Sequence, residues 1–132
     1  MSLVVDASVL VTAILSHDVA AERLRERLRQ IASWVAPHHI DLECMSAWRS
    51  MFLRGLISRG DYTSATEYLT DAPIRRYATW GLNGRIQELA PSVSIYDGAY
   101  VALAEISGLT LLTCDQRLAR ASGPRCEFEV AC

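Results

Sequence analysis

The amino-acid sequence predicts an α/β fold, a three-layer α/β/α sandwich around a mainly parallel central sheet. Short apolar segments alternate along the chain with longer segments whose apolar residues recur at intervals of three and four. Strands that are separated by helices in this way are typical of parallel sheets. The chain has 132 residues, of which 51% are hydrophobic, enough for one core. We therefore expect a single domain over residues 1–132.

The spacing of apolar residues in the first half of the chain predicts two strands and four helices. Asp18 is expected to be the N-cap of the second helix, and Asp41 can cap the third. Pro37 is expected to close the second strand. We expect strands over residues 3–5 and 34–36, and helices over residues 7–16, 18–31, 41–55 and 61–70.

The second half contains one ambiguous stretch, residues 71–85, in which we expect a short strand or a turn. A largely apolar helix then leads to Gly108, a natural helix C-cap. The last segment, which is short, is expected to be an edge strand. We expect helices over residues 82–89, 95–108 and 115–122, and strands over residues 109–113 and 126–131.

The composition excludes several classes of protein. A hydrophobic fraction of 51% excludes a disordered chain. No apolar stretch approaches the roughly 18 to 20 residues that a membrane span needs. The N-terminus has no basic segment before its apolar residues and makes a poor signal peptide, so we expect a cytoplasmic protein. The cysteines lie far apart without a C-x-x-C pair, and we expect free thiols. They are Cys44, Cys114, Cys126 and Cys132.

One carboxylate interrupts the apolar run LVVDASVLV, residues 3–11. Aspartate is almost never fully buried unless its charge is compensated. Asp6 lies at the junction between the first expected strand and the helix that follows it. Asp115 likewise lies at the junction between the strand LTLLT and the next helix. Glu43 and Asp97 each lie in the first turn of a helix that follows an expected strand or turn. Because parallel strands end at the same edge of a sheet, we expect Asp6, Glu43 and Asp115 to meet there, and Asp97 to join them if its helix starts nearby.

Each acid also has an ordinary structural explanation. Asp6 and Asp115 can be N-caps, and Asp97 follows Ser94 at the spacing of a loose capping box. Glu43 can favour the positive end of its helix dipole. It lies, however, in a helical stripe that should face the core, and the chain has no lysine to pair with it. Several carboxylates brought together repel one another, and a divalent cation removes that cost. Mg²⁺ or Mn²⁺ prefers oxygen ligands and supports phosphodiester hydrolysis.

Four motifs together resemble the PIN-domain ribonucleases, and especially the VapC-type toxins of bacterial toxin–antitoxin pairs. They occur in the family's order and cover nearly the whole chain. The motifs are VVDASVLV, DLECMSAWR with Glu43, YDGAYVALAE and LLTCDQRLARA.

The resemblance implies a metal-dependent endoribonuclease that is the toxin of a type II toxin–antitoxin pair. It implies that Asp6, Glu43, Asp97 and Asp115 are the catalytic and metal-binding residues, with Mg²⁺ or Mn²⁺ as cofactor. Asp6 and Asp97 would be the most direct ligands, and Glu43 and Asp115 would complete the site or orient the nucleophilic water. The implied partners are an RNA substrate, a cognate antitoxin and a second copy of the chain in a homodimer, with no membrane.

Two other functions fit parts of the sequence. A non-catalytic PIN-like binding module would keep the fold, although it would be expected to have lost one or more acids. A haloacid-type phosphohydrolase also has an aspartate after its first strand, but it needs a second aspartate two residues later, where this chain has Ser8. Residues 57–87 carry no motif of the family and are a candidate region for substrate choice.

Overall fold

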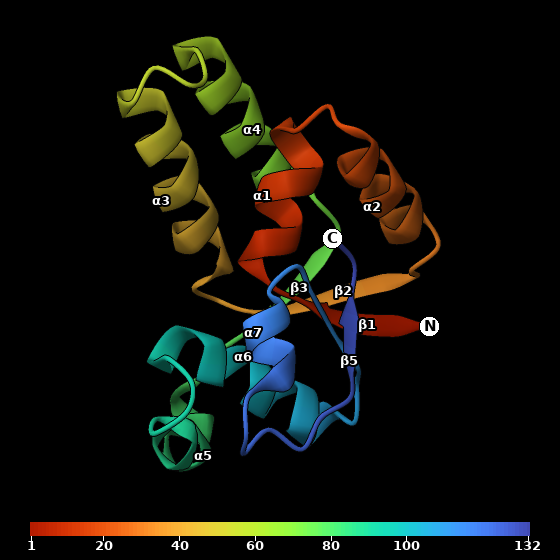
Figure 1. The fold of residues 1–132 in the computed structure, drawn as a ribbon, viewed down its shortest axis with the longest axis vertical. Coiled ribbons are helices and arrows are strands. Elements are labelled where there is room, and N and C mark those ends of the chain that lie inside the picture. Colours follow the sequence, from red (N-terminus) through yellow and green to blue (C-terminus); the bar gives the residue numbers. More distant parts are fainter.

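The computed structural model describes all 132 residues, and its strands form one five-stranded parallel sheet. The order across the sheet is β3-β2-β1-β4-β5, so that β1 is central and β3 and β5 are the edges (Figure 1). All four strand pairs are parallel, which confirms the expected sheet. The strands are β1 (Ser2–Val5), β2 (Ser33–Pro37), β3 (Ile74–Tyr77), β4 (Leu111–Thr113) and β5 (Phe128–Val130).

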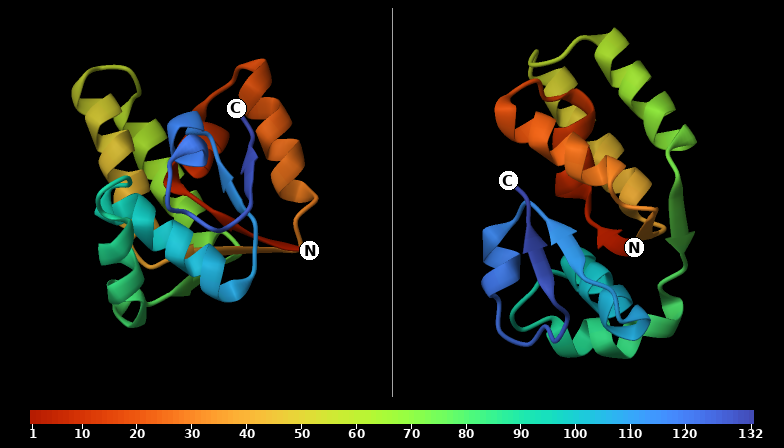
Figure 2. Two further views of the ribbon diagram at one scale, coloured as in Figure 1. Left: turned by 60° about the horizontal axis from the view of Figure 1, so that its bottom comes forward. Right: turned by 90° about the vertical axis from the view of Figure 1, so that its right-hand side faces the viewer.

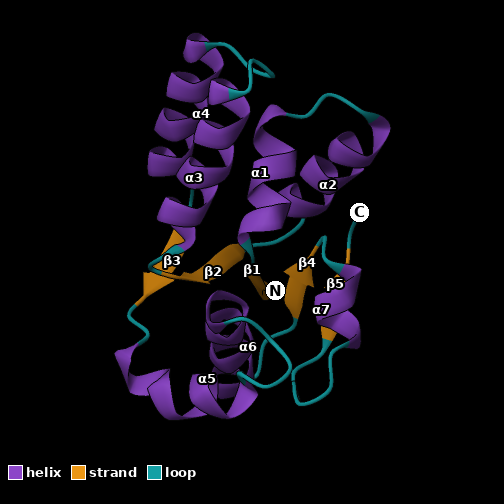
Figure 3. Ribbon diagram, turned by 60° about the vertical axis from the view of Figure 1, so that its left-hand side comes forward, coloured by secondary structure: helices purple, strands orange, loops and turns teal.

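Helices cover both faces of the sheet and complete the three layers. One group, α1 to α4, lies on one side of the sheet, and α5 and α6 lie on the other (Figures 2 and 3). The short helix α7 connects β4 to β5. The helices are α1 (Ala7–Leu15), α2 (Val19–Arg29), α3 (Ile40–Leu53), α4 (Arg59–Asp71), α5 (Asn83–Leu89), α6 (Ile95–Ser107) and α7 (Gln116–Arg120), with a 3-10 turn at Trp80–Leu82.

The core is continuous from the central strand to the helix beneath it. Leu3, Val4 and Val5 of β1 are at most 2% exposed, and residues 98–104 of α6 are all buried. This confirms that α6 is enclosed on several sides. Ile95 and Ile106, which the apolar pattern placed in the same helix, are exposed because they lie at its two ends. Gly108 ends the helix with φ 69°, the left-handed conformation that favours glycine.

The expected cap of α3 is wrong. Asp41 lies inside the helix, and His39 holds the N-cap position without a side-chain hydrogen bond. The Asp41 carboxylate instead accepts two hydrogen bonds from the Arg76 guanidinium, at 2.6 and 2.8 Å. Arg76 belongs to β3, which pairs with β2 just before α3 begins. A charge partner 35 residues away therefore replaces the local cap.

The expectation of four free thiols is also wrong, because Cys114 and Cys132 form a disulfide. β4 and β5 are parallel neighbours with Thr113 opposite Val130. The residues that follow the two strands therefore emerge side by side, which brings the two sulfurs together. Cys44 and Cys126 remain free.

No helix is both long and apolar enough to cross a membrane.

Candidate metal centre at the carboxyl edge of the sheet

Asp6 directly follows the central strand and is only 4% exposed. Its carboxylate accepts hydrogen bonds from the backbone N–H of Val9, at 3.2 Å, and from the hydroxyls of Ser8 and Thr113. Burial nevertheless raises the pKa of Asp6 to about 6, against the opposing effect of these three hydrogen bonds, and the charge of Asp97 raises it further. Asp6 therefore does cap α1, as its ordinary structural explanation predicted. The hydrogen bonds of the cap do not, however, offset the cost of burying its charge.

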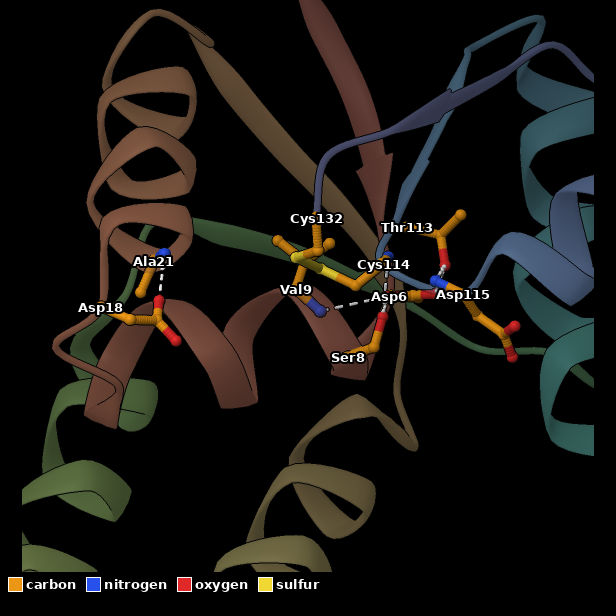
Figure 4. The surroundings of a disulfide bond; sticks show 9 residues. All are labelled: Asp6, Ser8, Val9, Asp18, Ala21, Thr113, Cys114, Asp115 and Cys132. Carbon is orange, nitrogen blue, oxygen red and sulfur yellow. Dashed lines mark hydrogen bonds between the residues drawn. A yellow bond between two sulfur atoms is a disulfide. The ribbon is translucent and has the colours of Figure 1, made fainter.

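The two hydroxyls that bind Asp6 also join it to the β4–α7 junction. The Ser8 hydroxyl accepts a hydrogen bond from the backbone N–H of Cys114, and Thr113 Oγ1 accepts one from the N–H of Asp115, each at 3.0 Å. Figure 4 shows this group of side chains between the ends of β1 and β4. The structure gives Ser8 and Thr113 a direct role in holding Asp6.

Asp97 lies in the first turn of α6, where its backbone N–H donates to the Ser94 hydroxyl at 3.1 Å. Burial raises the pKa of Asp97, and the negative charges of Glu43 and Asp115 raise it further, whereas the Ser94 hydrogen bond opposes the shift. Since such charge effects need short distances, acids from three separate elements lie near one another.

Glu43 is in the first turn of α3, and its Oε1 lies 2.9 Å from Nε2 of His39. Neither atom makes a hydrogen bond of good geometry, although this buried carboxylate oxygen lies against the His39 ring. The His39 ring packs edge-on against Tyr100, with ring centroids 4.9 Å apart, and the nearby Glu43 charge adds to the effect of burial in raising the pKa of Tyr100. Sequence reasoning missed His39, although the i, i+4 spacing to Glu43 would have indicated it.

Asp115 is the N-cap of α7, where its Oδ1 accepts from the N–H groups of Arg117 and Leu118 at 2.9 and 3.3 Å. Asp115 and Asp97 line one pocket of about 250 Å³, and the exposed Arg117 lines it too. Arg117 is a second residue that sequence reasoning missed, since only the pocket places it beside the acids.

Oxygen donors dominate this edge, as a hard divalent cation requires. The buried Glu43 oxygen, which makes no hydrogen bond of good geometry, and the costly buried charge of Asp6 fit such an ion. The acids are close enough to shift one another's pKa, but no three His, Cys, Asp or Glu side chains are packed into a preformed cage for a metal.

Known proteins share both the sequence and the fold of this chain. The family model described as "PIN domain" matches residues 3–124. Ribonuclease VapC12 of Mycobacterium tuberculosis is 37% identical over 128 residues, which cover 97% of this chain and 98% of that protein. A VapC ribonuclease of Mycobacterium bovis is 33% identical over 133 residues, covering 97% of both chains.

Two solved structures have the same fold at low sequence identity. VapC20 of Mycobacterium tuberculosis, described as a toxin that cleaves the sarcin–ricin loop, aligns with a TM-score of 0.71 and 13% identity over 89% of this chain and 93% of its own. FitAcB from Neisseria gonorrhoeae aligns with a TM-score of 0.68 and 15% identity, covering 97% of this chain and 96% of its own. The chain therefore belongs to the PIN-domain family, among its VapC ribonucleases.

Proposed function

We propose that this chain is a toxin endoribonuclease that binds Mg²⁺ or Mn²⁺ through Asp6, Glu43, Asp97 and Asp115 and hydrolyses RNA phosphodiester bonds. The observation that carries the metal site is the buried Asp6 carboxylate, whose pKa is raised to about 6 in the company of other acids. A group that is so costly to ionise at neutral pH, in spite of three hydrogen bonds, is well explained by a cation ligand.

The side chains around the proposed cation have different roles. Ser8, Thr113 and Val9 fix the Asp6 carboxylate, so that its position does not depend on the cation alone. Asp97 adds a second carboxylate from the opposite side of the sheet edge. A divalent cation, when bound, would polarise a phosphoryl oxygen and offset the charge of the acids.

We assign Glu43 and Asp115 to completing the ion's ligand shell or orienting the attacking water, because the charges of both act on Asp97 and so place them near it. Arg117, exposed in the pocket of Asp97 and Asp115, is suited to contact an RNA phosphate, since a guanidinium binds phosphate oxygens through paired N–H donors. Without such a cation, four acids would repel the RNA backbone.

The decisive experiment incubates the purified chain with structured RNA in Mg²⁺ or Mn²⁺ and then in excess EDTA. We expect cleavage only with the cation, and none by the Asp6→Asn variant. Asp18→Asn is the matched control, because Asp18 caps α2 through Ala21 N–H just as Asp6 caps α1, but contacts none of the acids. Cleavage that continues in EDTA, or that Asp6→Asn retains, would contradict the metal site. RNA binding without cleavage would indicate a binding module.

VapC toxins pair with antitoxins, and we propose the same partner here, together with a homodimer. Expression of the chain alone should arrest growth, and co-expression of a small protein encoded by the adjacent gene should relieve the arrest. Light scattering at micromolar concentration should give the mass of a dimer. A clean monomer would refute the dimer, and unimpaired growth would point instead to RNA processing.

A further inference from the structure

The disulfide is attached to the backbone of the candidate site. Cys114 stands between Thr113, whose hydroxyl binds Asp6, and Asp115, which lines the acidic pocket. The Cys114 N–H itself donates to Ser8, the other hydroxyl that binds Asp6. A displacement of this one residue would therefore disturb both hydroxyl groups that position the buried carboxylate.

Apart from the disulfide, the segment that Cys132 anchors is held by noncovalent contacts, among them the ion pair between Arg27 and Glu129 of β5, at 2.7 and 2.8 Å. β5 has only three residues and lies at the edge of the sheet, where it has a single neighbouring strand. The last backbone hydrogen bond of this pairing runs from Ala131 N–H to Thr113 C=O, at 3.0 Å. The Cys114–Cys132 bond then adds a covalent link one residue beyond it, at the end of both strands.

The disulfide and the Asp115 carboxylate extend in different directions from the strand-end loop. In Figure 4 the two sulfurs extend toward Val9 in the first turn of α1, whereas the Asp115 carboxylate points away from them. The bond therefore does not cover the acids. Its position suits an anchor for the loop and does not suit a plug of the pocket.

We propose that Cys114 and Cys132 are positioning residues, whose disulfide holds Thr113 and Asp115 in place against Asp6 and so favours metal binding. The proposal rests on the proposed metal site. Reduction leaves the ends of β4 and β5 held together only by noncovalent contacts, which makes the site sensitive to thiols. A dithiol supplies two electrons and two protons to the sulfurs of Cys114 and Cys132, which become thiols, and the dithiol closes to its own disulfide.

The test compares oxidised protein with protein reduced by dithiothreitol, with Mn²⁺ as the probe. We expect reduction to weaken Mn²⁺ binding about tenfold, the size of effect that the loss of an outer-shell partner causes at metal sites. Removal of the reductant and oxidation with oxidised dithiothreitol should restore the affinity. Cys132→Ser should bind Mn²⁺ as weakly as the reduced protein, and the reductant should not change its affinity. Cys126→Ser, which removes a free thiol, should lose Mn²⁺ affinity on reduction as the unmodified chain does.

Amide hydrogen exchange separates positioning from general loss of stability. Reduction should accelerate exchange of the Cys114 and Asp115 N–H groups, which donate to Ser8 and Thr113. The N–H of Val4, which donates to Thr110 C=O in the core, should stay protected. Equal acceleration of all three, or unchanged exchange and Mn²⁺ affinity after reduction, would overturn the proposal.

The exchange measurement also keeps the two proposals distinct. If the oxidised chain neither binds Mn²⁺ nor cleaves RNA, the proposed metal site fails, and the exchange rates still decide whether the disulfide fixes the loop. If the oxidised chain binds Mn²⁺ and reduction strengthens that binding, the metal site stands and the positioning role is refuted.

Discussion

The β1–α1 and β4–α7 junctions look alike in the sequence and differ in the folded chain. Each has an apolar strand, then an aspartate that caps the following helix, Asp6 for α1 and Asp115 for α7. Asp6 is 4% exposed and its pKa is raised to about 6, whereas Asp115 is half-buried and lines an open pocket.

The position of each strand in the sheet explains the difference. β1 is central and is flanked by β2 and β4, while β4 is next to the short edge strand β5. An aspartate at the end of the central strand is enclosed by neighbours, so that its hydration is lost and its charge is expensive. Helix capping explains why aspartate is tolerated at both junctions. Only burial distinguishes Asp6, the aspartate that needs a cation, from Asp115.

The largest effect should come from exchanging these two carboxylates for amides. Asp6→Asn should reduce RNA cleavage by about 10³-fold or more, because a bound cation supplies several kcal/mol of transition-state stabilisation. Asp115→Asn should cost about 10- to 100-fold, as for a residue that completes the site. Steady-state cleavage rates measure both. Equal losses in the two variants would break the distinction between the junctions.

The pH dependence of stability should expose the same difference in the metal-free protein. A carboxyl whose pKa is raised in the folded state binds more protons folded than unfolded, so stability falls as the pH rises from about 4 through about 6. For Asp6 the loss is about 3 kcal/mol, and the raised pKa of Asp97 acts in the same direction.

Urea unfolding in EDTA between pH 5 and pH 7 measures the upper part of this fall. The carboxyls whose pKa is lowered contribute stability that is lost only below this window, as the pH falls through their folded pKa; they are Glu22, Asp61, Glu105 and Glu129. Asp6→Asn should flatten the slope and raise stability at pH 7. A slope in the variant as steep as in the unmodified chain would show that Asp6 is not its source.

Thr113→Val should weaken the link between the two junctions. Thr113 is fully buried, donates to Asp6 Oδ2 and accepts from the Asp115 N–H, so its loss leaves this one carboxylate oxygen and the N–H without a partner. We expect a loss of about 1–3 kcal/mol in unfolding free energy and weaker Mn²⁺ binding. Thr110→Val, three residues earlier, is the matched control. The hydrogen bond of Thr110 runs from the Val4 N–H to its backbone C=O, which the substitution keeps. A similar loss in both variants would remove the special role of Thr113.

The smallest effect concerns the cap at the second junction. Asp115→Ala should lower the unfolding free energy by about 1 kcal/mol, because α7 loses the acceptor for Arg117 and Leu118 N–H. Asp115→Asn should retain this stability, since an amide oxygen also caps a helix. Thermal unfolding of both variants in EDTA checks the difference, and identical midpoints would mean that the cap contributes nothing.

Local sequence patterns predicted the features that depend on neighbours in the chain. The strand-to-helix transition at Asp6, the cap at Asp18 and the glycine end of α6 at Gly108 are all present. Each is decided by residues within one or two turns, where side-chain chemistry and backbone conformation are coupled directly.

The features that sequence reasoning missed depend on how the strands align. Arg76 reaches Asp41 because β2 and β3 are paired in a particular register, and Cys114 meets Cys132 because β4 and β5 end together. No local pattern specifies those registers. The position of His39 beside Glu43 was different, since its helical spacing was readable and only its relevance was overlooked.

The most direct test of the central claim is the thermal midpoint of the chain with and without saturating Mn²⁺ at pH 7. At a Mn²⁺ concentration about 100 times its dissociation constant, binding adds about 2.7 kcal/mol, which raises the midpoint by roughly 10 °C. We expect this rise in the unmodified chain, little or none in Asp6→Asn, and the full rise in Asp18→Asn. The same rise in Asp6→Asn as in the unmodified chain would contradict the claim that the buried carboxylate after the central strand is a metal ligand.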